Sequence, residues 1–372
     1  MNKHTLLTSC VLSLALLAAT SAHAQTATQS PSYTPPYATQ SQAYGSDQPV
    51  YALKAPSSSG STYQSARGAF SPMTARIVSD PLYQPLQGQI EGITAYTLGL
   101  PSSTVYNSAG VKRTESNSTN STFAQTVAYG VTDEFALRLL ENYSFGHTYR
   151  DNQINGNTTS SSVSGFSDPT VSAAYRFIDQ RRAHPVSATV DLSYTPDMID
   201  SEAAGGGQSG NEGAGRQSGT MSVDVGREMK NFTIDGITGL SYEGKRRYTN
   251  LGNNDNFQVD PFWNYFFGLR SQVRFTERLS LNADYRYTVQ DSTNNTNNTT
   301  GLSFAQSNPN FSDFTLAFNY HFIPNRLVGQ LSYDYYDYAN SSNTYATAPT
   351  DSTTTKDQTN NVIGARLLYV FN

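Results

Sequence analysis

Alternation of apolar and polar residues is the feature that most constrains the fold of this chain. From Arg278 to Gln290 ("RLSLNADYRYTVQ"), an apolar or aromatic residue occupies every second position and polar residues fill the positions between. Successive side chains of a β-strand point to opposite faces, so this pattern predicts a strand with one apolar and one polar face. The apolar face must be covered by a second sheet, as in a soluble sandwich, or by lipid.

Similar patterns recur twelve times from Ile90 to the end of the chain. We expect strands at residues 90–100, 121–131, 134–149, 165–178, 185–197, 218–229, 231–247, 258–275, 278–290, 310–323, 326–340 and 359–371. No segment in this region is apolar for long enough to form a transmembrane helix. With 25 tyrosines and 18 phenylalanines beside many small polar residues, the composition is typical of an all-β protein.

The connections between the predicted strands alternate in length. Those after even-numbered strands are short, such as "VTDE" and "FTER", whereas those after odd-numbered strands are longer. An outer-membrane barrel has tight turns on the periplasmic side and long loops outside, whereas the crossings of a Greek-key sandwich mix the two. The alternation therefore favours lipid as the cover. It predicts a transmembrane antiparallel up-and-down β-barrel of about 12 strands.

Three segments precede the predicted barrel, which spans residues 90–372. Residues 1–24 have a basic start, a short apolar run and small residues before the expected cleavage point, which predicts a secretory signal peptide. Residues 25–70 are rich in Ser, Thr, Gln, Pro and Tyr, so we expect a disordered low-complexity leader. Residues 71–89 are transitional, and the pattern leaves a plug, a capping segment and a linker open.

Aromatic residues gather near the ends of the predicted strands, where the two headgroup layers of a membrane would lie. We expect Tyr285, Tyr287, Tyr333 and Tyr335 at the external interface, and Phe275, Phe322, Tyr369 and Phe371 at the periplasmic interface. The terminal segment "NVIGARLLYVFN" resembles the closing strand of outer-membrane proteins. Its last aromatic residue, Phe371, is followed by Asn372, which departs from that pattern.

The polar faces of the predicted strands carry charges of both signs. Candidate residues that line the lumen and select solutes are Arg138, Arg176, Asp224, Asp235, Arg270, Arg274, Asp284, Arg286, Asp334 and Arg366. Unpaired charges are costly in a narrow interior, so we expect many of them to pair or to meet water. A turn at residues 276–278 would place Arg270 opposite Asp284, and we predict a contact between them.

These charges could alternatively serve only to fill the interior. Barrels of eight strands are filled by side chains and those of sixteen or more are open, so twelve strands suggest a narrow or gated passage.

Neither catalysis nor a cofactor is predicted. His147, at the outer end of the third predicted strand, lies where a hydrolase at the barrel rim would need a base, but its neighbours form no nucleophile–base–orienter set. Cys10, the only cysteine, lies in the expected signal peptide, so no thiolate metal site is expected. The net charge of −5 argues against a nucleic-acid partner. The expected partners are outer-membrane lipid and lipopolysaccharide, the barrel assembly machinery and a small-molecule solute, and the oligomeric state stays open.

Two stretches resemble the outer-membrane proteins grouped under the meta-pathway of phenol degradation. "YGVTDEFALRL" (Tyr129–Leu139) contains the Tyr-Gly-hydrophobic-Thr-Asp turn of that family, and "GFSDPTVSAAYRFI" (Gly165–Ile178) contains its Gly-x-x-Asp start of a strand ending in Tyr-Arg. "SYTPDM" (Ser193–Met198) keeps the proline but not the glycine of a third motif. The resemblance implies a barrel channel for small solutes, including aromatic or apolar compounds.

The sequence thus predicts a barrel in the outer membrane of a Gram-negative bacterium that acts as a passive channel with a narrow, charged lumen. The alternative is a surface-exposed adhesion or interaction barrel with a blocked lumen. A hydrolase with its site at the barrel rim is the third hypothesis.

Overall fold

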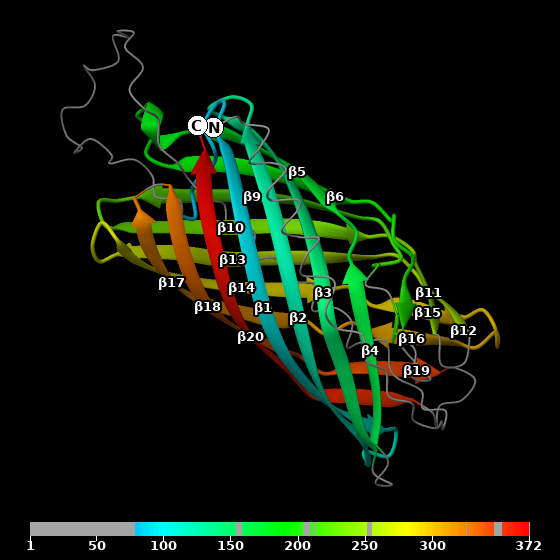
Figure 1. Cartoon of the computed structure of the whole chain (residues 1–372). Coiled ribbons are helices and arrows are strands. Elements are labelled where there is room, and N and C mark those ends of the chain that lie inside the picture. Colours follow the sequence, from blue (N-terminus) through cyan, green and yellow to red (C-terminus); the bar gives the residue numbers. More distant parts are fainter. Residues whose placement is uncertain are drawn as a thin grey trace. The chain divides into compact units, whose positions relative to one another are not determined.

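Twelve strands form a closed antiparallel wall in the computed structural model of the chain (Figure 1). The structure describes residues 79–153, 158–203, 209–210, 213–250, 255–324, 326–345 and 352–371. The wall strands are β1 (Ile90–Asn107), β2 (Lys112–Gly130), β3 (Phe135–Gln153), β5 (Thr170–Ile178), β6 (Ser187–Thr195), β9 (Ser218–Glu228), β10 (Phe232–Glu243), β13 (Phe262–Arg274), β14 (Leu279–Gln290), β17 (Phe311–Ile323), β18 (Leu327–Tyr338) and β20 (Thr353–Phe371). The expected signal peptide (1–24), the leader (25–70) and residues 71–78 lie outside the described residues.

The wall closes where the last strand meets the first. Ile90 of β1 lies opposite Phe371 of β20, and the register continues along both strands. Every wall strand therefore has a partner on both sides, and closure leaves no edge with unpaired backbone groups. The structure confirms the predicted all-β barrel of twelve antiparallel strands, including a first strand that begins at residue 90.

All the short connections lie at one end of the wall, which we call the short-turn end. Two of these turns share the same hydrogen bonding. Thr132 Oγ1 accepts from the backbone N–H groups of Glu134 and Phe135, and Thr276 Oγ1 accepts from those of Arg278 and Leu279. A threonine hydroxyl in this position replaces a backbone partner and favours a tight turn. A 3₁₀ turn, η2 (Gln180–Arg182), follows β5 at the same end.

Short strands continue the wall at the opposite, outer end. They are β4 (Thr158–Phe166), β7 (Glu202–Ala203), β8 (Ser209–Gly210), β11 (Arg246–Asn250), β12 (Asp255–Val259), β15 (Thr293–Asn297), β16 (Ser303–Ser307) and β19 (Ser341–Tyr345). They pair with one another and with the outer halves of the long strands β3 and β20 (Figure 1). Three of the longer connections that the sequence predicted as loops after odd-numbered strands (102–120, 291–308 and 341–360) are therefore largely strands in their described parts. Their residues carry no apolar alternation, because both faces of a strand beyond the lipid can meet water.

Three predicted strands are each divided in the structure. The segment 165–178 breaks between β4 and β5, where Pro169 removes a backbone donor. The segment 258–275 breaks at Pro261 between β12 and β13, and the segment 231–247 breaks at residues 244–245 between β10 and β11. Each break lies where the wall gives way to the outer strands, and the strand pairing changes there to a new partner.

Candidate functional site in the barrel lumen

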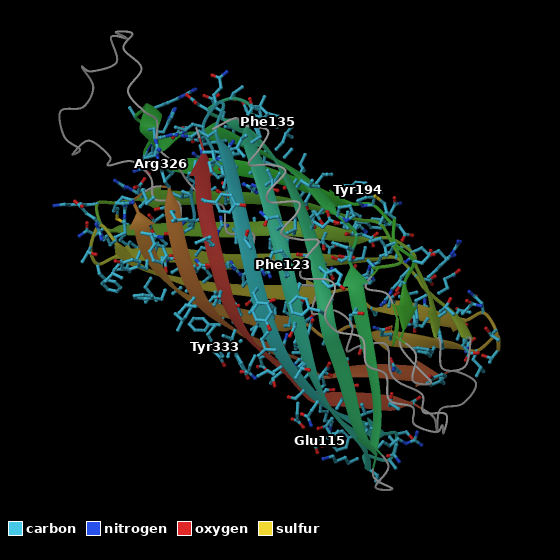
Figure 2. The ribbon with its side chains drawn as sticks, in the orientation of Figure 1. Glu115, Phe123, Phe135, Tyr194, Arg326 and Tyr333 are labelled. Atoms are coloured by element: carbon cyan, nitrogen blue, oxygen red, sulfur yellow. The ribbon has the colours of Figure 1, made fainter. Side chains whose placement is uncertain are left out.

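The two faces of the wall differ in polarity, as β13 shows. On β13, the exposed fractions of Trp263, Tyr265, Phe267 and Leu269 lie between 40% and 57%, whereas those of the alternating Asn264, Arg270 and Gln272 are 6% or less. Tyr333 marks the same outer surface on β18 (Figure 2). Because a closed wall leaves only the lumen as its interior, the polar side chains line the lumen and the apolar ones face outward.

An apolar outer band of this kind is stable only when lipid covers it. Leaving apolar surface in water costs about 25 cal/mol per Å². On β13 the outward apolar residues occupy successive alternate positions of the strand. Across the described residues, no helix has the length and apolar character needed to cross a membrane.

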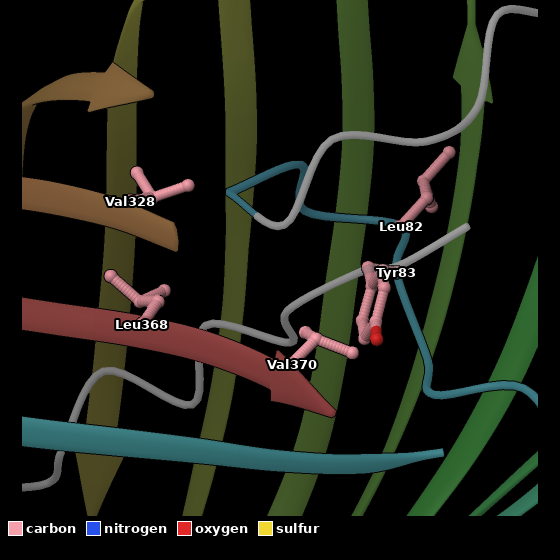
Figure 3. Packing of buried hydrophobic residues seen from close by; sticks show 5 residues of the cluster. All are labelled: Leu82, Tyr83, Val328, Leu368 and Val370. Carbon is pink, nitrogen blue, oxygen red and sulfur yellow. The ribbon is translucent and has the colours of Figure 1, made fainter. Parts of the chain in front are cut away.

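Residues 79–89 run inside the barrel at the short-turn end, and we call them the inner segment. Leu82 and Tyr83 are buried and pack with Val328 of β18 and with Leu368 and Val370 of β20 (Figure 3). These wall positions are among the few apolar side chains that point inward at this end. The inner segment therefore fills the short-turn end of the lumen with an apolar contact.

Hydrogen bonds hold the inner segment to four further wall strands, β5, β10, β13 and β14. The carbonyl oxygen of Ser79 accepts from Gln272 Nε2 at 2.8 Å and from Asn282 Nδ2 at 2.9 Å. The carbonyl of Leu82 accepts from Arg176 Nη2 at 2.5 Å. Thr233 Oγ1 donates to Asp80 Oδ2 at 2.5 Å. Each bond satisfies a buried polar group that would otherwise destabilise the interior by about 1–3 kcal/mol.

Small residues on the wall provide the room that the inner segment occupies. Ala128, Ala136 and Ala174 are at most 1% exposed at the short-turn ends of β2, β3 and β5. Gly130 exchanges backbone hydrogen bonds with the segment, accepting from Gly88 N at 2.8 Å and donating to Gln89 O at 3.0 Å. A Cβ atom at Gly130 would overlap the carbonyl oxygen of Leu86. A larger side chain there is therefore incompatible with the observed path of the segment.

A belt of side-chain amides runs along the inner face of the wall next to the inner segment. It comprises Gln272, Asn282, Asn319 and Gln330, on four consecutive wall strands, all at most 4% exposed. Asn282 Oδ1 accepts from Gln272 at 3.0 Å and from Asn319 at 2.9 Å, and Gln330 donates to Asn319 Oδ1 at 2.7 Å. Because the belt also binds Ser79, it couples the position of the inner segment to four strands.

Most of the predicted lumen charges form ion pairs with residues on another wall strand, either the adjacent strand or the next but one. Arg138 contacts Asp191 at 2.7 Å, and Arg274 contacts Glu228 at 3.0 Å. Arg286 contacts Asp313 at 3.0 Å. Pairing of this kind offsets the desolvation of charges in a narrow interior.

Arg270 occupies the predicted register but its ion pairs lie on another side. The structure confirms that Arg270 lies opposite Asp284, with Gly268 opposite Arg286. Its guanidinium binds Asp235, with Nε 2.6 Å from Oδ2, and approaches Asp224 at 3.9 Å. The predicted contact with Asp284 stays a prediction.

Three other predicted lumen residues, Arg176, Asp334 and Arg366, differ in burial and in their contacts. Arg176 is 1% exposed and contacts the inner segment. Asp334 is buried and accepts from Thr315 Oγ1 at 2.5 Å, while Arg366 is half-buried on β20. Their role in selecting solutes is taken up below as a proposal.

Aromatic side chains near the outer end of the lumen were not among the predicted site residues. Phe266, Phe311, Tyr336 and Tyr338 have the same strand parity as neighbouring buried polar residues such as Arg270, Asp313 and Asp334. The ring of Phe311 lies 5.2 Å from that of Tyr338 and 6.5 Å from that of Tyr336. Their strand parity is the sequence signal that assigns them to the lumen.

Asp168 organises the outer connection between β6 and β9. Its Oδ1 accepts from the N–H groups of Met198 at 2.7 Å and Ile199 at 2.8 Å, and Oδ2 accepts from that of Ala214 at 2.9 Å. Asp168 is the acidic residue of the Gly-x-x-Asp motif. Burial raises the pKa of the neighbouring Asp197, and the charges of Asp168 and Asp200 add to this effect.

The eight predicted interface aromatics lie on the outer face. Tyr285, Tyr333, Tyr335, Phe275, Phe322 and Phe371 are 37–60% exposed, and Tyr287 and Tyr369 are half-buried. The rings of Tyr369 and Phe322 lie across Gly92 and Gly329 of neighbouring strands, where a Cβ atom would collide with them. Their position at the two headgroup layers stays a prediction.

The candidate base His147 and possible metal ligands were the remaining sites that the sequence raised. His147 belongs to β3, but its side chain lies outside the described part of the structure. Within that part, no three His, Cys, Asp or Glu side chains gather in a way that could hold a metal ion.

The closed wall, its apolar outer band and its polar lumen define this protein as a bacterial outer-membrane β-barrel. A scan against protein-family models found no match, and a search of curated proteins found none either. The chain is similar in structure to an outer-membrane channel from Pseudomonas putida F1, with a TM-score of 0.50 and 13% identity over 77% of this chain and 97% of that one. This likeness supports the barrel fold.

Two further solved barrels are less similar. The transport unit of the autotransporter AIDA-I from Escherichia coli matches with a TM-score of 0.48 and 10% identity over 78% of this chain and 91% of that one. The outer-membrane protease OmpT from Escherichia coli matches with a TM-score of 0.35 and 9% identity over 76% of this chain and 97% of that one. TM-scores below 0.5 do not support a comparison of function.

Proposed function

We propose that this protein is a passive outer-membrane channel for small solutes, without enzymatic activity. The observation that carries the proposal is a polar inner face that continues from the short-turn end to the outer strands inside a closed wall. A barrel that served only as an anchor would gain more stability from an apolar, fully packed interior than from paired charges. Polar groups along the whole inner face instead favour contact with water and with passing solutes.

The inner segment would act as the closure of this channel. It occupies the lumen at the short-turn end and is bound there through side-chain and backbone hydrogen bonds. Passage therefore requires the segment to move. Because the segment joins the wall at Ile90, after Gln89, a shift of residues 79–84 would open the lumen without breaking the strand pairing of β1.

Selection would follow from the paired charges and from the width of the lumen. The ten predicted lumen residues present both signs, so we expect weak preference for one ion charge and stronger preference for size. The resemblance to the phenol meta-pathway family supports aromatic or apolar compounds as solutes. Outer-membrane lipid, lipopolysaccharide and the barrel assembly machinery are the proposed partners in the membrane and during insertion.

A second function has one observation in its favour. The inner segment and the amide belt block the short-turn end in the observed conformation, and paired strands continue the wall at the outer end. This arrangement also suits a surface-exposed adhesion or interaction barrel whose lumen never opens. Conductance separates the two functions, because only a channel needs the inner segment to leave.

A reversible lock of the inner segment tests the proposal. Ser79 Oγ lies 3.4 Å from Ser280 Oγ, so the variant Ser79→Cys/Ser280→Cys should form a disulfide without large backbone movement. The chain without residues 1–24 has no other cysteine. We expect planar-bilayer conductance and solute uptake into vesicles for the reduced variant, and loss of both when it is oxidised.

The Ser79→Cys variant alone is the matched control, and it should conduct in both redox states. If neither the unmodified protein nor the reduced variant passes ions or solutes, the channel is wrong and the blocked barrel is favoured. Hydrolysis of peptides or esters that His147→Ala abolishes would restore the hydrolase hypothesis.

A further inference from the structure

An aromatic and acidic cluster faces the outer half of the lumen, and neither the ion pair of Arg286 with Asp313 nor the inner segment accounts for its four aromatic residues. We call it the upper-lumen cluster, and it comprises Phe266, Arg286, Phe311, Asp313, Tyr336 and Tyr338. Arg286, Asp313 and Tyr336 lie directly opposite one another on β14, β17 and β18. In the next inward-facing row toward the outer end, Phe266, Phe311 and Tyr338 share one register through Thr288.

The carboxylate of Asp313 is only partly satisfied by its neighbours. Arg286 Nη2 contacts its Oδ2 at 3.0 Å. The other oxygen, Oδ1, is buried and has no hydrogen-bond partner among the described residues. Asp313 as a whole is 6% exposed. A buried acceptor without a donor is unfavourable unless a ligand or water supplies one. The position therefore calls for a hydrogen-bond donor in the lumen.

The tyrosines of the cluster offer further polar contacts. Neither Tyr336 nor Tyr338 forms a hydrogen bond through its hydroxyl with another residue in the described ranges, and both side chains are half-buried. Their rings lie 6.4 Å apart and are nearly parallel, at 19°. Together with the ring of Phe311 they present aromatic faces at distances suited to stacking against a further ring.

The local charge favours a cation. Asp284 and Asp334 lie opposite Thr315 in the inward-facing row below Asp313, so three carboxylates lie near the guanidinium of Arg286. The guanidinium of Arg270, in that same row, contacts Asp235 and Asp224 on the other side. Arg366 lies opposite Gln330, two inward-facing rows below Asp334, and its positive charge also acts on Asp313, so these three carboxylates face the two guanidinium groups of Arg286 and Arg366. An anionic solute would meet this excess of negative charge, whereas a cation would reduce it.

We propose that the upper-lumen cluster binds small protonated aromatic amines. The ammonium group would donate to Asp313 Oδ1 and to the tyrosine hydroxyls, and the ring would stack on Phe311 and Tyr338. Aromatic faces also attract cations directly, which adds to the carboxylate contact. The role of this site in passage rests on the proposed channel function, but binding itself does not require the inner segment to move.

The experiment uses the protein without residues 1–24 in a neutral detergent and follows binding by saturation-transfer NMR titration. The probes are 2-phenylethylammonium and 3-phenylpropionate, which share a ring and differ in charge. We expect saturable binding of the amine and at least about tenfold weaker binding of the carboxylate. In Asp313→Asn, which keeps the shape but removes the charge, the amine should bind about tenfold more weakly.

The wall supplies matched controls on its outer face. Tyr335 and Asp337 lie beside the cluster in sequence but face outward, so Tyr335→Leu and Asp337→Asn should leave binding unchanged, whereas Tyr336→Leu should weaken it. A heat-dependent shift on SDS gels checks that each variant is folded, and Tyr338→Leu replaces any variant that is not.

Equal binding of the two probes, or amine binding that Asp313→Asn leaves unchanged, would overturn the proposal. Binding of the amine by a protein that never conducts would instead contradict the channel and leave the site intact.

Discussion

The guanidinium of Arg176 donates a 2.5 Å hydrogen bond to the backbone carbonyl of Leu82. Arg176 lies on the wall and is 1% exposed, while Leu82 belongs to the inner segment and is fully buried. Arg176 belongs to β5, and the side chain of Leu82 approaches Gly226 of β9, so this bond holds the inner segment to that side of the wall. Arg176 therefore positions the inner segment as well as contributing charge to the lumen.

Replacing Arg176 with methionine should loosen the inner segment while keeping most of the packing volume. The carbonyl of Leu82 would lose its hydrogen bond from a charged donor. A hydrogen bond of this kind contributes about 1.5–3 kcal/mol to stability. The rate at which a maleimide labels Ser79→Cys reports the loosening, because Ser79 is 3% exposed in the closed state. We expect labelling to accelerate about tenfold or more. Arg176→Lys keeps a donor and should have a smaller effect, and equal labelling rates in all three proteins would contradict the role of Arg176.

Gly130→Ala should displace the inner segment from its other end. The added methyl group would overlap the carbonyl oxygens of Leu86 and Pro85, and these backbone atoms cannot yield without moving the segment. We expect faster labelling of Ser79→Cys and a larger conductance than in the unmodified protein. Gly236→Ala is the control, because its nearest neighbour would be 3.8 Å away. A closed, non-conducting Gly130→Ala variant would show that the segment accommodates the methyl group in place.

Leu269→Arg tests whether lipid covers the outer face. Leu269 is 57% exposed near the middle of β13, and arginine at the midplane of a bilayer destabilises a barrel by about 2–4 kcal/mol. Phe275→Arg, beyond the short-turn end of the same strand, should have an effect of only about 0–1 kcal/mol. The measurement is denaturant unfolding in lipid vesicles. If the two variants lost equally little stability, the apolar band would face water.

Asp168→Asn should loosen the outer connection without affecting the wall. An amide side chain keeps one acceptor oxygen where the carboxylate provides two, so at least one of the bonds to Met198, Ile199 and Ala214 would be lost. We expect faster cleavage by trypsin at Arg216, which is 4% exposed in the intact protein, and an unchanged heat-dependent gel shift. Asp200→Asn, an exposed residue of the same connection, is the control and should be cleaved at the original rate.

The residues in the wall were predictable because lipid imposes a rule on each position separately. Alternation between Leu279 and Val289 identified β14 to within one residue at its start, and the same parity placed Arg270 opposite Asp284. Parity also assigned Tyr335 to the outer face, and it would have assigned Tyr336 to the lumen had aromatic residues been considered there. The outer strands β15 and β19 escaped prediction because polar residues occupy both of their faces, so periodicity gives no signal.

The sequence by itself determined the barrel, its strand count and the face on which each side chain of the wall lies. The two-residue repeat of apolar side chains and the alternation of short and long connections are both local properties of the chain. Only the tertiary structure decided what fills the lumen. Ser79 meets Asn282 across 203 positions of sequence, and residues 79–89 have no periodicity that could announce their partners. Their place depends on side chains from several strands converging after the wall has closed, and a pattern read along one strand contains no information about that convergence.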